Sequence, residues 1–373
     1  MSYPPPPGGP PPGNPGPPQG YSGPYGRTPQ QPPWQQQWPA GPPPKKRGNA
    51  WKWLLGGVAL LAVIGVTVAV TISATSDGGG NNDPTPSGET FGLASADDTG
   101  PANIITEDPS CAAWGPINDT FASVQKRGWN RRDPSVPSTR WTADERQQHL
   151  EVADAARKAA DQAERLAEIT PHRVLRESYE QFIAYARAYS DAVPSYTPLD
   201  DHLARVFTST GAMIVYLCAA ADYGSAAARA PLIGTPEPPT KLSPLSPPRD
   251  SERFMLNPDP ICSDWERVLN QFNDDTKAWQ ALDSSKAASD WTPQERATAD
   301  AAIPTMERFA DRIEEIGRTS VNPVVQDFAT LSAQYRRAYA AALSSYTPAD
   351  SFLTSTSRNA ASAIYEACES AES

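Results

Sequence analysis

The sequence has very little histidine, with three residues in a chain of 373, and it lacks the short motifs of common catalytic sites. It contains no glycine-rich phosphate loop, no HExxH helix and no GxSxG turn. His149 follows Glu145 by four residues, whereas helical di-iron sites use a three-residue step. We therefore predict no catalytic residue and no cofactor, and we expect surface positions for the histidines, which are His149, His172 and His202.

Acidic residues are missing from the first 76 positions, which hold five Lys or Arg. The rest of the chain carries 27 basic and 43 acidic side chains, a net charge of −16. Binding to nucleic acid needs basic patches that displace counterions from the phosphates. The charge distribution therefore argues against nucleic acid as a partner.

Charge of either sign is absent from the 24 residues between Trp53 and Ser76. An apolar helix of this length crosses a bilayer core of roughly 30 Å, so we predict one transmembrane helix over 51–76. A secretory signal peptide is the alternative, but its apolar stretch is shorter and lies nearer the N-terminus. Basic flanks stay in the cytoplasm. We therefore expect a plasma-membrane protein with a cytoplasmic N-terminus and extracytoplasmic C-terminal domains. The basic residues before the helix are Lys45, Lys46, Arg47 and Lys52.

Large aliphatic residues are scarce in the first 44 positions, which hold eighteen of the 41 prolines. Such a segment cannot bury enough apolar surface to offset the entropy of ordering it, so residues 1–50 are predicted to be a disordered cytoplasmic tail. The tail could serve as a recognition segment for partner domains or as a solvated spacer. Residues 77–107 are rich in Gly, Asn, Asp, Thr and Ser, and we expect a flexible stalk.

Four short motifs occur twice beyond the stalk. They are DPSCAAW at 108–114 and DPICSDW at 259–265, WTADER at 141–146 and WTPQER at 291–296, YARAY at 185–189 and YRRAY at 335–339, and SYTPLD at 195–200 and SYTPAD at 345–350. The offset is 151 residues at the first pair and 150 at the others, which indicates two copies of one unit. We predict repeat 1 at 108–229 and repeat 2 at 259–373, joined by a Pro-rich linker at 230–258.

The periodicity within each copy is helical. Apolar residues recur at steps of three and four, and no segment shows the alternation of a strand. Thr142 with Glu145, and Thr292 with Glu295, have the spacing of a capping box at a helix start. The sequence therefore predicts an all-α protein in which each repeat is a bundle of four helices.

Each copy has one cysteine near its start and one near its end. Four cysteines permit three disulfide connectivities, and the duplication favours the two bonds that allow each repeat to fold by itself. These are Cys111 with Cys218 and Cys262 with Cys368. A zinc site is the alternative, but no CxxC or Cys/His spacing supports it, so we predict no metal.

Tyrosine and arginine occupy the same columns in both copies. The candidate binding residues are Tyr185, Arg187, Tyr189, Tyr335, Arg337 and Tyr339. Arginine beside tyrosine suits a carboxylate or a sugar. The alternative is structural, with the tyrosines in the core and each arginine bound to an acidic neighbour, because residues shared between repeats usually serve the shared core.

The organisation of residues 1 to about 110 resembles that of proline-rich single-pass membrane proteins of mycobacteria and related actinobacteria. The resemblance lies in the Pro/Gly/Tyr/Gln-rich start, the KKR sequence before one span, and the small exterior domain with a cysteine pair. It implies a cell-envelope setting and carries no catalytic residue.

Our leading hypothesis is a non-enzymatic, membrane-anchored envelope protein whose repeats bind a partner protein or a small envelope ligand. Duplication without a catalytic motif favours it. One alternative is an envelope hydrolase or transferase that acts through carboxylates, which would need a buried acidic pair of raised pKa lining a cleft. Another is a receptor that relays ectodomain occupancy inward, although the sequence shows no two-state element for that role.

Overall fold

The computed structural model describes residues 89–371, and this part of the chain is helical with no strand. The all-α prediction is therefore confirmed. The predicted tail at 1–50 and the predicted transmembrane helix at 51–76 lie outside the described residues, as do positions 77–88 of the predicted stalk and residues 372 and 373.

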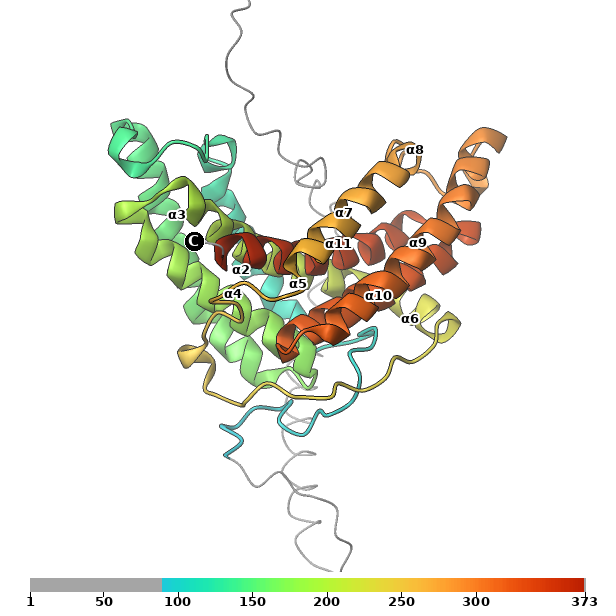
Figure 1. Ribbon diagram of the computed structural model, residues 1–373, viewed down its shortest axis with the longest axis horizontal. Helices are drawn as coiled ribbons and strands as arrows, with labels where there is room; N and C mark the ends of the chain where they lie inside the picture. The colour runs from blue at the N-terminus through green and yellow to red at the C-terminus, as the bar shows by residue number, and fades with distance from the viewer. Residues whose placement is uncertain (1–88, 372–373) are drawn as a thin grey trace, which may run out of the picture. The chain divides into compact units, whose positions relative to one another are not determined.

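Each repeat contains four long helices in the same order (Figure 1). In repeat 1 they are α2 (Cys111–Gln125), α3 (Ala143–Ile169), α4 (Arg173–Ala192) and α5 (Asp201–Asp222). In repeat 2 they are α7 (Cys262–Asp275), α9 (Pro293–Thr319), α10 (Pro323–Ala342) and α11 (Ser351–Ala371). The short helices are α6 (Ser225–Arg229) and α8 (Lys277–Gln280). Turns of 3₁₀ helix occur at Trp129–Arg131, Ser138–Arg140, Val193–Ser195, Pro198–Asp200, Ala230–Leu232, Pro248–Asp250, Ala288–Asp290, Leu343–Ser345 and Pro348–Asp350.

Capping boxes fix where α3 and α9 begin. The Thr142 hydroxyl accepts a hydrogen bond from the Glu145 backbone N–H at 3.2 Å, and the Glu145 carboxylate accepts one from the Thr142 N–H at 2.8 Å. Thr292 and Glu295 repeat the arrangement in the second copy, with 3.2 and 2.7 Å. Both boxes satisfy backbone donors that a helix start otherwise leaves without partners. The local sequence thus sets the same start for both helices.

Each repeat is closed by its own disulfide bond. Cys111–Cys218 joins the start of α2 to the end of α5, and Cys262–Cys368 joins the start of α7 to the end of α11. The Cα atoms are 5.3 and 5.6 Å apart, within the normal range for a disulfide. The pairing predicted from the duplication is confirmed.

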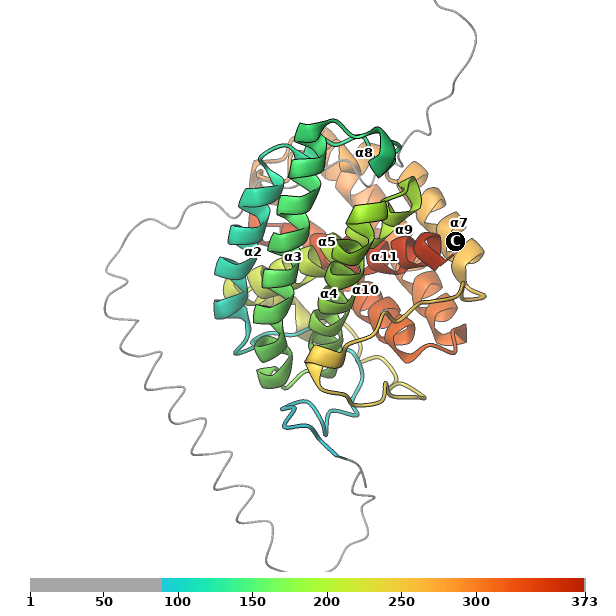
Figure 2. The ribbon, with the colours of Figure 1, turned by 90° about the vertical axis from the view of Figure 1, so that its left-hand side faces the viewer.

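Within each repeat the helices pack on their sequence neighbours. Helices α2, α3 and α4 lie side by side in repeat 1 (Figure 2), and α9 lies along α10 in repeat 2. The core of repeat 1 is aromatic: the rings of Trp114 and Phe182 are 5.0 Å apart at their centroids, and those of Phe121 and Phe207 are 5.6 Å apart. Gly211 contributes a carbonyl that accepts the Trp114 indole N–H at 3.3 Å.

The two repeats contact each other mainly through α5 and α11 (Figure 1). His202 on α5 and Glu366 on α11 are joined across this interface, with Nδ1 2.7 Å from the carboxylate. Burial alone would lower the pKa of His202, but the hydrogen bond to Glu366 and the charge of that carboxylate outweigh burial, so the pKa is raised. Among the described helices, the segment Pro198–Asp222 around α5 is long and apolar enough to cross a membrane, yet 67% of its most apolar stretch is buried inside the protein. Its apolar character reflects contacts with both repeats.

Residues 89–107 differ from the flexible stalk that the sequence predicts at 77–107. Leu93 and Ile105 are buried, and the Ala94 N–H donates to the Glu168 carbonyl at 2.9 Å. The Tyr335 hydroxyl on α10 of repeat 2 contacts the backbone of Ile105, which precedes repeat 1 in the sequence. The apolar residues of this polar segment are isolated and show no periodicity. The composition therefore indicated a flexible stalk, whereas residues 89–107 pack against the helices.

The Pro-rich segment at 230–258 also packs against the helices. Gln181 on α4 accepts a hydrogen bond from the Phe254 N–H at 2.9 Å and donates to the Glu252 carbonyl at 3.2 Å. Met255 is buried. The linker therefore contributes to the core of the described part of the chain.

Candidate functional site

The four tyrosines of the predicted binding set are buried in the helical core. Tyr185 donates to the Met255 carbonyl at 3.3 Å, and Tyr335 donates to the Ile105 carbonyl at 3.4 Å. The Tyr189 and Tyr339 hydroxyls accept indole N–H bonds from tryptophans. Burial raises the pKa of all four hydroxyls. The tyrosines hold loops and linker against α4 and α10.

The two arginines of the set lie apart from the tyrosine hydroxyls, on the faces of α4 and α10 that meet α3 and α9. Arg187 binds Asp161 at 2.8 Å and also Glu164. Arg337 binds Asp311 at 2.8 Å and Glu314 at 2.5 Å. The side chains are 29% and 24% exposed. Each arginine thus joins two neighbouring helices, and the structure does not gather the six residues into one pocket.

His149 corrects the expectation of a surface histidine. Its ring is buried, stacks on Trp141 with 3.9 Å between the centroids, and has Nδ1 2.8 Å from the Tyr189 hydroxyl. Burial lowers the pKa of His149 to about 4, so the ring is neutral at physiological pH. The reason is its position three residues before Val152, on the apolar stripe of α3. That stripe was the signal for burial.

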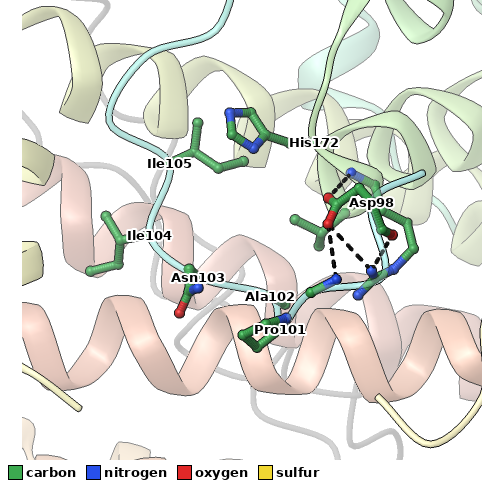
Figure 3. A pocket seen from close by; sticks show the side chains of 10 residues that line it. Asp98, Pro101, Ala102, Asn103, Ile104, Ile105 and His172 are labelled. Carbon is green, nitrogen blue, oxygen red and sulfur yellow. Dashed lines mark hydrogen bonds and ion pairs between the residues drawn. The ribbon is translucent and has the colours of Figure 1, made fainter. Parts of the chain in front are cut away.

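A pocket of about 210 Å³ lies at the start of α4 (Figure 3). It is lined by residues of the 98–105 loop and by residues 172–174. Figure 3 shows Ile104 and Ile105 across the pocket from Asp98. The His172 ring Nε2 donates to the Glu107 carbonyl at 3.2 Å. The pocket wall is thus part apolar and part polar.

Arg173 forms the charged wall of this pocket and is 2% exposed. Its Nε and Nη2 donate to the two carboxylate oxygens of Asp327 at 2.8 and 2.9 Å, across to repeat 2. Its Nη1 donates to the Asp98 carbonyl, and its backbone N–H donates to the Asp98 carboxylate, both at 2.7 Å. Burial alone would lower the pKa of Arg173, but the bonds to Asp327 outweigh it and raise the pKa. Arg173 therefore joins α4, α10 and the 98–105 loop.

Glu177 lies one turn beyond Arg173 on α4 and is fully buried. Neither carboxylate oxygen has a hydrogen-bond partner. The duplication explains this, because Glu177 and Asp327 occupy the same column, whereas the column of Arg173 holds Pro323 in repeat 2. Asp327 therefore has an arginine that bonds it in fork geometry, and Glu177 has none. Burial, and then the charge of Asp327, raise the pKa of Glu177 well above its ordinary value.

Two further charged groups complete this buried cluster. Arg176 is 1% exposed, and its Nε and Nη1 have no hydrogen-bond partner. Its Nη2 is 3.9 Å from Glu177, and its Nε is 3.7 Å from Glu180. These distances allow electrostatic attraction but no hydrogen bond. The cluster can hold a proton on Glu177.

Among residues 89–371, no group of three His, Cys, Asp or Glu side chains is arranged to hold a metal ion.

We expect Glu177→Gln to make the protein more stable than the wild type at pH 7. Because burial raises the pKa of Glu177, the folded protein binds a proton there at pH values where the unfolded chain, with an ordinary glutamate pKa of about 4.3, has released it. Between this value and the raised folded pKa, stability falls as pH rises, by about 1.4 kcal/mol per pH unit for one full proton. The variant lacks this dependence, so its advantage should shrink toward zero near pH 4.5. Chemical denaturation of the full chain at several pH values measures the difference.

The exposed Glu307 offers a matched control, because Glu307→Gln makes the same chemical change on the surface of α9. We expect this variant to follow the wild type at every pH. A Glu177→Gln protein that is less stable than the wild type at pH 7 would contradict a protonated Glu177.

Arg173, Glu177 and Asp327 were not among the residues predicted from the sequence. One signal was present: acidic residues share the 177 and 327 column and are flanked by core positions in both helices. Charged residues on helices usually face solvent, and only the contact between α4 and α10 shows that these do not.

Comparison with known proteins identifies relatives of this chain. Residues 93–372 match the family described as "Mycobacterial ESX-1 associated protein". An uncharacterised protein of Mycolicibacterium smegmatis (strain MKD8) is 48% identical over 344 residues, which cover 90% of each chain. No solved structure matches. The mycobacterial kinship inferred from the sequence is confirmed, while the membrane anchor stays a prediction. The chain belongs to the family of mycobacterial ESX-1 associated proteins.

Proposed function

We propose that this protein is a membrane-anchored, non-enzymatic interaction module of the mycobacterial cell envelope, and that its helical repeats bind an ESX-1 component. The family description supports the link to ESX-1. The charge-free run at 53–76 and the basic residues before it support an anchor with a cytoplasmic N-terminus. The two disulfides fit an oxidising location outside the cytoplasm.

The joining of the two repeats is the observation that carries this proposal. Each repeat is closed by a disulfide, and the buried Arg173–Asp327 pair and the His202–Glu366 pair link one repeat to the other. Such links favour a surface of fixed shape, which lowers the entropy lost when a partner protein binds. The repeats are thus suited to recognition.

The hydrolase alternative finds less support. It needs an acidic group of raised pKa that lines a cleft. Glu177 has the raised pKa, but it is fully buried and is not among the residues that line the pocket at the start of α4. The polar groups of Arg173 and Asp98 at that pocket are engaged with each other and with Asp327.

Cross-linking in living mycobacterial cells, followed by purification through a tag on the N-terminal tail, tests the proposal. The matched control is a chain that ends at residue 107, which keeps the predicted anchor and lacks both repeats. We expect ESX-1 components to be enriched with the full chain and not with the control. Equal recovery of these components with both chains, or enrichment with neither, would contradict the proposal.

A further inference from the structure

The core of repeat 2 lacks two aromatic rings that are present in repeat 1. The columns of Phe182 and Phe207 hold Ser332 and Ser357 in repeat 2. The Ser332 hydroxyl donates to the Ser357 carbonyl at 2.8 Å, so α10 and α11 meet there through small polar side chains. Serine is smaller than phenylalanine, so the side chains at these two columns fill less of the core in repeat 2 than in repeat 1.

Arg336 occupies this region and is 3% exposed. Its guanidinium carbon lies 4.9 Å from the centroid of the Phe272 ring and 5.7 Å from that of Phe309. Nη1 donates to the Thr354 hydroxyl at 2.6 Å, while Nε is buried without a hydrogen-bond partner. The equivalent residue in repeat 1 is Ala186, so the buried cation belongs to repeat 2 alone.

A second arginine lies next to this group. Arg358 follows Thr354 by one turn on α11 and is partly buried. Within residues 89–371, neither Arg336 nor Arg358 forms an ion pair with a carboxylate. Burial lowers the pKa of Arg336 to about 10; Tyr339 opposes this shift, and the charge of Arg358 adds to it. Burial also lowers the pKa of Arg358. In repeat 1 the column of Arg358 holds Thr208.

Two neighbouring guanidinium groups without a carboxylate partner are unusual inside a protein, because buried charges are normally paired. The aromatic rings compensate part of the charge on Arg336 through cation–π attraction. The rings leave the Nε–H of Arg336 without an acceptor and do not offset the repulsion from Arg358. A bound anion would accept a hydrogen bond from Nε and would also neutralise the two positive charges.

We propose that repeat 2 binds a small phosphate-type oxyanion between α10 and α11, held by Arg336, Arg358 and the Thr354 hydroxyl. The guanidinium fork presents several N–H donors to the oxygens of such an ion. Thr354 and Arg358 are partly exposed, so this group borders solvent, whereas Arg336 is buried and donates to Thr354. Repeat 1, with Ala186 and Thr208 at these columns, has no equivalent site.

Titration of the purified full chain in detergent with inorganic phosphate tests this site, with sodium chloride at equal ionic strength as the reference. We expect one binding event and a rise in Tm of about 3–5 °C at a phosphate concentration ten times the Kd. Arg358→Gln should weaken binding at least about tenfold, because it removes charge-assisted bonds to the ion. Its partly exposed position makes this variant the better choice over a change at the buried Arg336.

Arg308→Gln is the matched control, since it removes an exposed arginine of α9 whose Nη2 donates only to Thr305. We expect it to bind phosphate as the wild type does. Equal phosphate responses of the wild type and Arg358→Gln, or no binding by a wild-type chain that is folded, would overturn the proposal. Glycerol 3-phosphate, titrated in parallel, separates two sources: binding of both compounds indicates that the site admits an esterified phosphate such as a lipid headgroup, and binding of phosphate alone indicates the free ion.

Discussion

Arg173→Ala is expected to lower the free energy of unfolding by about 3–5 kcal/mol, because it leaves the Asp327 carboxylate buried without its cation. The loss should be large for a single substitution, since Arg173 also donates to the Asp98 carbonyl of the loop that lines the pocket. Denaturant unfolding of the full chain in detergent measures it, provided that the slope with denaturant stays unchanged.

Arg187→Ala provides the control for this prediction. Arg187 also binds two carboxylates, but its side chain is 29% exposed, and ion pairs of this kind contribute about 1 kcal/mol or less. The burial of Arg173, rather than the number of its acidic partners, is therefore expected to set the cost. Similar losses in the two variants would contradict the view that burial of the Arg173–Asp327 pair sets the cost.

Removal of one disulfide is expected to lower the free energy of unfolding about as much as Arg173→Ala does. For a loop of 106 residues, closed by Cys262 and Cys368, the chain-entropy account gives about 4–5 kcal/mol of stabilisation. The double change Cys262→Ala and Cys368→Ala should lower the unfolding free energy by this order, and unfolding experiments measure the loss directly.

The other disulfide serves as an internal comparison, because Cys111 and Cys218 are separated by 107 residues. Its removal by the same double substitution should cost a similar amount. A loss below about 1 kcal/mol in both cases would mean that the helices of each repeat do not need their disulfide, contrary to the entropy argument.

Much of the fold follows from local sequence. Thr142 with Glu145 determines where α3 begins, and the same pair of residue types determines the start of α9. The duplication then fixes the disulfide pairing, because a bond within each copy is the connectivity that lets a repeat fold by itself. These signals depend on residues close in sequence or on the comparison of one copy with the other.

The contacts between the repeats could not be predicted in this way. Arg173 and Asp327 are 154 residues apart, and helix periodicity does not show which helix of one copy meets which helix of the other. The same limit applies to residues 89–107, where Leu93 and Ile105 are buried by helices distant in sequence. For the tyrosines, pattern alone left a core role and a binding role open, and the structure places their hydroxyls against buried backbone and indole groups.

Labelling of single added cysteines with a membrane-impermeant maleimide on spheroplasts tests most directly whether the repeats lie outside the cytoplasm on a membrane anchor. Val321 is 71% exposed in the loop before α10, and Ser22 belongs to the N-terminal tail. Val321→Cys should react on intact spheroplasts, and Ser22→Cys only after lysis. Reaction of Ser22→Cys on intact spheroplasts, or of Val321→Cys only after lysis, would contradict the account.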